Sequence, residues 1–199
     1  MQELSALLAA ILTVISAFFG PAKTAPLNTG PIVNQSVTQT SAVATLSIVP
    51  KEINVGVGKT SSFDIKISAD SPDISAIAIR MHYPFGGNTP ALSTLDALPA
   101  KPGIQAGINP GLAADNWSYP VNDFSLNNNN KIATLDLALV HMSPTGFHFE
   151  SGTTLATVNF QTVSPGNLTL NFDLSDTKVI DKKGEELPLI TQKGIINIK

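Results

Sequence analysis

Histidine and carboxylate side chains are the first candidates for chemistry in this chain, because it contains no cysteine. Without cysteine there is no thiol nucleophile, no disulfide and no thiolate metal ligand. The chain has no Gly-x-Ser-x-Gly turn that would present a nucleophilic serine. Its three histidines have spacings that match no common zinc pattern; they are His82, His141 and His148. The sequence therefore predicts a protein that is not an enzyme and has no metal centre built on histidine.

Acidic residues leave two further options open. Asp136 and Glu150 could supply the two carboxylates that glycoside hydrolysis needs, although solvated surface acids are the simpler interpretation. A group of five acids near the C-terminus could bind Ca²⁺, which takes several oxygen ligands, although their spacing is not that of an EF-hand loop. The alternative is that they keep a hairpin soluble, and no cofactor other than this Ca²⁺ is expected. The five acids are Asp173, Asp176, Asp181, Glu185 and Glu186.

Trp117 and Tyr119 are the candidates for carbohydrate binding. They are two residues apart, so on a strand they share one face. Exposed aromatic rings on a β-sandwich can stack on sugars, helped by hydrogen bonds from amide and carboxylate groups. Asn116 and Asp115 lie beside them in the sequence and supply such groups. The alternative interpretation is that Trp117 and Tyr119 are core residues.

These side chains must be positioned by β-strands, and the clearest strand signal lies between residues 60 and 83. Apolar and polar residues alternate over 60–68, which predicts a strand with one wet face. After a turn the alternation resumes over 76–83, with Ile77 and Ile79 on one face. An antiparallel pair of this kind cannot hide its apolar rows, so a second sheet must cover them. The opposite face of the second strand is a candidate protein-contact face made of Ala76, Ala78, Arg80 and His82.

Further alternating segments continue to the C-terminus, and residues 85–116 are expected to form a long crossover. Pro120 is expected to end a short strand that begins at Trp117, and Leu174 is expected to extend an inward row over 168–174. A hairpin turn at 181–184 precedes a last strand at 194–199. About nine strands without an amphipathic helix predict an all-β fold, a β-sandwich of jelly-roll topology.

The N-terminal part of the chain differs from the rest in composition. Residues 4–19 are almost entirely apolar, and no charge occurs between Glu3 and Lys23. We therefore expect residues 1–21 to be a signal peptide or membrane anchor, and this predicts an exported, surface-associated or secreted protein. Residues 22–43 are rich in Pro, Thr and Ser and are expected to be a flexible linker before a domain at 44–199. The alternative for 4–19 is a core helix, but a helix that is apolar all round needs burial on every side.

The charge balance excludes one class of partner. The chain has 12 Lys and Arg against 15 Asp and Glu, with a formal net charge of -3, and its basic residues form no run. Nucleic-acid binding proteins need a basic footprint to neutralise phosphates. No nucleic-acid partner is therefore expected.

The order of the segments from residue 44 to residue 199 resembles that of cohesin-like modules, which share a jelly-roll sandwich with certain cellulose-binding modules. The matching pieces are Val-Gly-Lys-Thr at 57–60 leading into the strand at 63–67, the strand at 74–84, Gly-Thr-Thr-Leu at 152–155, and the closing turn and strand. Residues 85–130 match poorly. The resemblance implies a non-catalytic cell-surface binding module that binds carbohydrate and belongs to polysaccharide-degrading surface assemblies.

The alternative function is a structural or adhesive surface protein that contacts a partner protein, dockerin-like or other, without binding sugar. Exposure of Trp117 and Tyr119 would favour the carbohydrate. A bare apolar face around Ala76 and Ala78 would favour a protein.

Overall fold

The computed structural model describes residues 43–69, 73–87 and 89–199. The predicted signal peptide or membrane anchor at 1–21, and all of the predicted linker except Val43, lie outside the described residues. Within the described ranges, no helix has both the length and the apolar character needed to cross a membrane.

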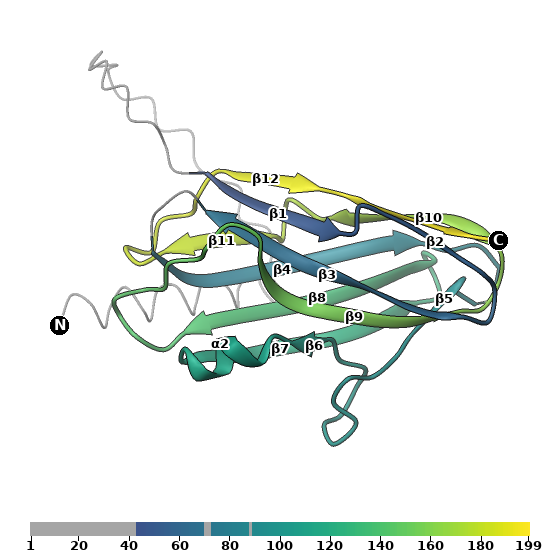
Figure 1. Ribbon diagram of the computed structural model, residues 1–199, viewed down its shortest axis with the longest axis horizontal. Helices are drawn as coiled ribbons and strands as arrows, with labels where there is room; N and C mark the ends of the chain where they lie inside the picture. The colour runs from purple at the N-terminus through teal and green to yellow at the C-terminus, as the bar shows by residue number, and fades with distance from the viewer. Residues whose placement is uncertain (1–42, 70–72, 88) are drawn as a thin grey trace, which may run out of the picture.

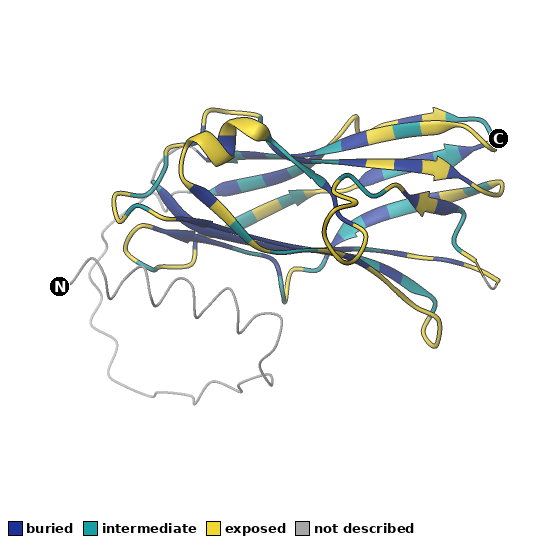
Figure 2. Cartoon of the chain, turned by 90° about the horizontal axis from the view of Figure 1, so that it is seen from below, coloured by how far each residue is buried: buried dark blue, intermediate teal, exposed yellow. Residues whose placement is uncertain are grey.

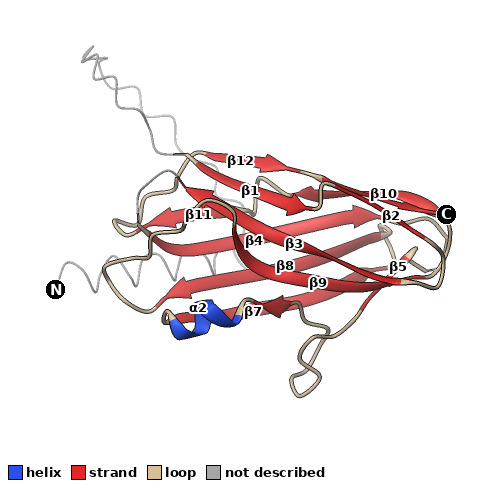
Figure 3. Cartoon of the chain, viewed as in Figure 1, coloured by secondary structure: helices blue, strands red, loops and turns tan. Residues whose placement is uncertain are grey.

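The domain is a sandwich of two β-sheets, as the alternating pattern predicted (Figure 1, Figure 3). One sheet has the order β12 (Leu189–Gln192), β1 (Ala44–Val49), β3 (Thr60–Ala69), β9 (Thr153–Thr162) and β5 (Leu92–Thr94), with β6 (Gly107–Ile108) also paired to β9. The other has the order β2 (Glu52–Val55), β13 (Gly194–Ile198), β10 (Gly166–Phe172), β4 (Ile74–Pro84), β8 (Ile132–His141) and β7 (Trp117–Asn127), with β11 (Lys178–Asp181) also paired to β4.

The main core lies between these sheets and consists of the inward rows that the alternation indicated. Phe63 and Ile65 of β3 and Ile77 and Ile79 of β4 are all buried in this one core. β3 and β4 are not an antiparallel pair, however: β3 pairs with β1 and β9, whereas β4 pairs with β8, β10 and β11. The connection between them crosses from one sheet to the other, because each apolar row needs an opposing sheet to cover it.

The crossover at 85–116 holds two short strands and the one helix among the described residues. The helix, α2 (Pro110–Ala114), is capped at its N-terminus by Asn109, whose side chain accepts a hydrogen bond from the backbone N–H of Gly111. The crossover is fixed to β7 by Asn122, whose side chain exchanges two hydrogen bonds with the backbone of Ala106. Buried Leu112 joins α2 to the core.

Two local expectations were wrong. Pro120 does not end its strand: β7 runs through it, and the pairing register with β8 shifts between Ser118 and Val121. A proline is tolerated there because β7 is an edge strand and the irregularity removes the need for its missing N–H. Leu174 is 62% exposed rather than inward, because β10 ends at Phe172 and the chain turns at Asp173.

Candidate functional site

The outer face of the seven-stranded sheet changes from apolar to charged along its strands. The register places Ile180, Ala76 and Val140 side by side across β11, β4 and β8. The next row along β4 is Ala78 with Ala138, where Ala78 is also opposite Lys178 of β11 and Ala138 is also opposite Val121 of β7. The third row pairs Arg80 with Asp136, and the fourth pairs His82 with Thr134. The four residues predicted to form a protein-contact face therefore do lie on one face.

The first two rows form a second apolar cluster, separate from the main core, which we call the outer apolar patch. Its five buried members are Ala76, Ala78, Ala138, Val140 and Ile180, and half-buried Val121 packs against them. Ala76 and Ala78 are 0% exposed. The face around Ala76 and Ala78 is therefore apolar, but the two alanines are buried rather than bare.

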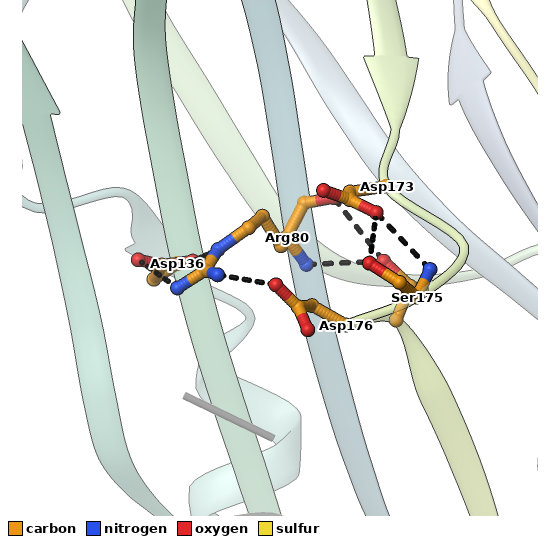
Figure 4. Close-up of polar contacts among 6 residues, drawn as sticks. Arg80, Asp136, Asp173, Ser175 and Asp176 are labelled. Atoms are coloured by element: carbon orange, nitrogen blue, oxygen red, sulfur yellow. Dashed lines mark hydrogen bonds and ion pairs between the residues drawn. The ribbon is translucent and has the colours of Figure 1, made fainter. Parts of the chain in front are cut away.

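Arg80 is the centre of the charged rows (Figure 4). Its Nε and Nη2 donate to the two carboxylate oxygens of Asp136, at 2.8 and 3.2 Å, and its Nη1 donates to Asp176. These contacts, first of all the hydrogen bond to Asp136, raise the pKa of the guanidinium. A bidentate arginine–carboxylate pair fixes both orientation and charge, so this group is held rigidly on the sheet surface.

The turn at residues 173–177 positions Asp176. It connects β10 to β11, and Thr177 Oγ1 both accepts from the backbone N–H of Arg80 and donates to its carbonyl, each at 3.1 Å. Asp173 stabilises the turn by accepting hydrogen bonds from the hydroxyl and the backbone N–H of Ser175. The hydrogen bond from the Ser175 hydroxyl is the main cause of the lowered pKa of Asp173. We call Arg80, Asp136, Asp173 and Asp176 the Arg80 cluster.

Acids outnumber bases in this part of the face. Asp123 of β7 is exposed and lies opposite Asp136 in the pairing register. With Asp123 and the Arg80 cluster, this part of the face holds four carboxylates, of which those of Asp136 and Asp176 contact the guanidinium of Arg80. The charged end of the face is therefore acidic, next to an apolar end.

The five acids considered for Ca²⁺ do not converge. Asp173 accepts from Ser175 and Asp176 accepts from Arg80, whereas Asp181 accepts from the N–H groups of Lys183 and Glu185 in the hairpin turn. Glu186 pairs instead with Lys178 at 2.7 Å. Within the described part of the chain, no three His, Cys, Asp or Glu side chains are grouped as metal ligands. Binding of Ca²⁺ stays a prediction that this arrangement does not favour.

Trp117 occupies a different position from the one a sugar platform needs. It is 4% exposed, and its ring packs against His141 at 5.2 Å, Phe149 at 5.3 Å and Phe147 at 6.0 Å between ring centres. The alternative interpretation, that Trp117 is a core residue, describes it correctly. Its aromatic faces are taken by other rings and do not form a stacking surface.

The other three residues named for carbohydrate binding lie nearer the surface. Asp115 and Asn116 are exposed after α2, and Asn116 has a φ of 62°. Tyr119 is half-buried and lines a hollow of about 400 Å³. Burial raises the pKa of its hydroxyl. Polar side chains in the same hollow come from Lys101, Gln105, Asn122 and Asp123.

The three histidines are far from forming one site. His82 is on the outer face, exposed His148 is in a loop, and His141 is buried. The two ring nitrogens of His141 lie 3.0 and 3.2 Å from the backbone oxygens of Asp115 and Ser143. His141 therefore fixes the loops at the end of β8. Sequence spacing gave no signal for this role, because the partners are backbone groups.

Known proteins share this fold but not this sequence. The sequence matches no protein-family model and no curated protein. Solved structures with the same fold include a non-cellulosomal cohesin from Archaeoglobus fulgidus, with a TM-score of 0.54 and 14% identity over 78% of this chain and 91% of that one. A type II cohesin domain from Acetivibrio cellulolyticus has a TM-score of 0.56 and 18% identity over 78% and 95% of the two chains.

A third similar structure is a type I cohesin from Clostridium thermocellum in complex with a dockerin. Its TM-score is 0.51, with 11% identity over 79% of this chain and 99% of that one. The predicted cohesin-like β-sandwich is thus confirmed as a fold. At these identities the similarity concerns architecture, and function must be argued from the face itself.

Proposed function

We propose that this domain is a non-catalytic protein-binding module whose partner docks on the outer face of β11, β4, β8 and β7. The observation that carries the proposal is the outer apolar patch. Antiparallel sheets commonly keep their second face polar, whereas this one carries alanine, valine and isoleucine in adjoining rows. Small alanine side chains let another backbone approach the sheet closely. An apolar face of this kind is typical of a protein contact.

The charged end of the face indicates the chemistry of the partner. Arg80 binds the carboxylates of Asp136 and Asp176, and two more acids, Asp123 and Asp173, lie in the same part of the face. A partner that approaches with lysine or arginine beside its apolar surface would match these charges, and such complementarity sets orientation and association rate. The partner therefore combines an apolar strip with an adjacent basic group.

The fold supports a first choice of partner. The Clostridium thermocellum cohesin of the same architecture was solved with a dockerin bound. We therefore place a dockerin-like protein first among partners, and an exported or cell-surface location is part of the same proposal. A structural or adhesive role fits this face better than carbohydrate binding does.

Titration calorimetry of the full chain with a panel of purified dockerin modules tests this proposal. Binding should be lost in Ala78→Arg, which puts a long charged side chain into the outer apolar patch. The matched control is Ser62→Arg, at an exposed position on β3 in the other sheet, and it should bind like the unchanged chain. Equal affinity in both variants would show that the partner uses another surface.

Carbohydrate binding is the second candidate, and the hollow beside Tyr119 is the observation that favours it. One half-buried aromatic ring with amide and carboxylate groups around it is a minimal sugar subsite. Affinity electrophoresis in soluble polysaccharides tests it, with Tyr119→Ala as the variant. Retardation that Tyr119→Ala abolishes would establish a carbohydrate site. Migration unaffected by every polysaccharide would remove this candidate.

A further inference from the structure

The outer apolar patch is buried although it lies outside the main core. β4 is buried at every position from Ile74 to Ile79, and β8 at every position from Leu137 to His141. Unbroken buried stretches of strand appear in dark blue in Figure 2. Strands buried on both faces need a layer of structure on each side. The six-stranded sheet supplies one layer, on the inner face. The outer face requires a second layer over Ala76 and Ala78.

The described residues contribute little to that second layer. Among the described residues, half-buried Val121 is the apolar side chain that packs against the outer apolar patch. The neighbouring outward positions in the register are polar, namely Ser118, Lys178, Arg80 and Asp136. A cover made from this chain must therefore come from residues 1–42, 70–72 or 88.

The amino-acid composition of those segments shows which of them is apolar enough to cover the patch. Residues 70–72 are Asp-Ser-Pro, residue 88 is Asn and residues 22–42 are rich in Pro, Thr and Ser. Residues 4–19 are the strongly apolar stretch and contain no charge. The connection from residue 20 to residue 43 can span about 75 Å when extended, which is enough to reach either face of a domain of this size.

We propose that the apolar segment at residues 4–19 covers the outer apolar patch of its own chain. Burying leucine, isoleucine and phenylalanine against alanine and valine removes both apolar surfaces from water. The alanines at 76, 78 and 138 allow the segment to lie close to the sheet. The segment thus occupies the face that the proposed function assigns to a partner for as long as it is neither cleaved nor inserted in a membrane, and its release opens that face to the partner.

Thiol labelling of the full chain tests this inference directly, because the chain has no native cysteine. The chain is purified with residues 1–199 confirmed by intact mass, and Ala78→Cys reports the covered position. Ser62→Cys, exposed on the other sheet, is the reference for an open thiol. Ala78→Cys should react with a maleimide at least about tenfold more slowly than Ser62→Cys.

Two double substitutions to aspartate then identify the segment that covers the patch. Ile11→Asp with Ile15→Asp should release the segment and raise the labelling rate of Ala78→Cys about tenfold or more, while the circular dichroism spectrum stays unchanged. Gln35→Asp with Gln39→Asp adds the same charge outside the segment and should leave the rate as it was.

Three results would overturn the inference. Slow labelling of Ala78→Cys in both double variants would mean that the domain covers the patch with its own side chains. Fast labelling in the unchanged N-terminal background would mean that nothing covers it. A rate that rises on dilution of the protein would assign the cover to a second copy. The labelling assay contains no partner, so a negative result leaves the proposed function untouched. Likewise, failure to bind any dockerin in the calorimetry would leave this inference untouched.

Discussion

At the scale of single residues, burial separates side chains that share a strand. Ile79 of β4 is fully buried between the sheets, whereas Arg80 points outward and is fixed by two carboxylates. Tyr83, four residues after Ile79, is on the inner side with its hydroxyl 3.4 Å from the backbone oxygen of Leu92. Each of these positions has a different physical constraint, and each gives a separate test.

Ile79→Ala should lower the free energy of unfolding by about 2 to 5 kcal/mol, because it removes buried methyl groups and leaves a cavity. Urea unfolding followed by circular dichroism measures the change. Ile190→Ala is the control, since Ile190 is 54% exposed on β12 and should change the free energy of unfolding by less than about 0.5 kcal/mol. An unchanged midpoint in Ile79→Ala would show that the inner face is wrongly assigned.

Tyr83 should make the protein sensitive to alkali. Burial raises the pKa of its hydroxyl above the ordinary 10.0. The folded state therefore holds this proton at pH values where the unfolded state has lost it. The contribution of Tyr83 to stability is thus constant below about pH 10 and falls above it, by up to about 1.4 kcal/mol per pH unit. Urea unfolding at pH 8 to 11 should show a shallower loss in Tyr83→Phe. Parallel pH profiles for both proteins would rule out this role.

At the scale of elements, the turn at 173–177 connects two strands that pair with successive parts of β4. β10 pairs with Met81 and His82, and β11 pairs with Ile74, Ala76, Ile77 and Ala78. Between them the turn replaces strand pairing at Arg80 with hydrogen bonds from Thr177 and from the backbone N–H of Asp173. The turn therefore completes the sheet and brings Asp176 to Arg80.

Thr177→Val should cost about 1 to 3 kcal/mol of unfolding free energy, because it keeps the shape of a buried side chain but removes both hydrogen bonds between the Thr177 hydroxyl and the backbone of Arg80. Thermal unfolding gives the measurement. Thr191→Val, at a half-buried position on β12, is the matched control and should shift the midpoint little. Equal midpoints for the two variants would mean that the turn is held by other contacts.

At the scale of the whole molecule, the close approach of the two sheets depends on a glycine of one sheet that packs against an isoleucine of the other. Gly194 begins β13 in the seven-stranded sheet, and a methyl group there would lie 2.6 Å from Cγ2 of Ile48 in β1 of the other sheet. The sheets thus approach closely at this end of the sandwich. Because protein interiors are close-packed, neighbouring side chains have little room to move away from such a clash.

Gly194→Ala should destabilise the domain by about 1 to 3 kcal/mol through overpacking. Combining it with Ile48→Ala removes the clashing methyl, so the double variant should lose less stability than the sum of the two single variants. Gly86→Ala is a control, because a methyl group there meets no atom within 4 Å. Strict additivity, measured by urea unfolding, would show that the sheets can separate locally at no cost.

Alternation in the sequence was sufficient for the fold class and for much of the candidate face. The period of two determines which residues of 74–84 share a side, so the sequence alone groups Ala76, Ala78, Arg80 and His82 on one face. It could not show that Leu174 is exposed, because the alternation of apolar and polar residues continues past Phe172, where the strand ends. The expectation that Pro120 ends a strand failed for a similar reason, since the register shift that tolerates it depends on β8.

What the sequence by itself determined is therefore local: strands, their two faces, the absence of thiol chemistry and the change in composition near residue 43. Tertiary structure decided every relation between distant residues. It placed β3 and β4 in different sheets, buried Trp117 among His141, Phe147 and Phe149, and brought Asp136 and Asp176 to Arg80. The physical reason is that periodicity follows from the geometry of one strand, whereas pairing and burial depend on which strands lie next to each other.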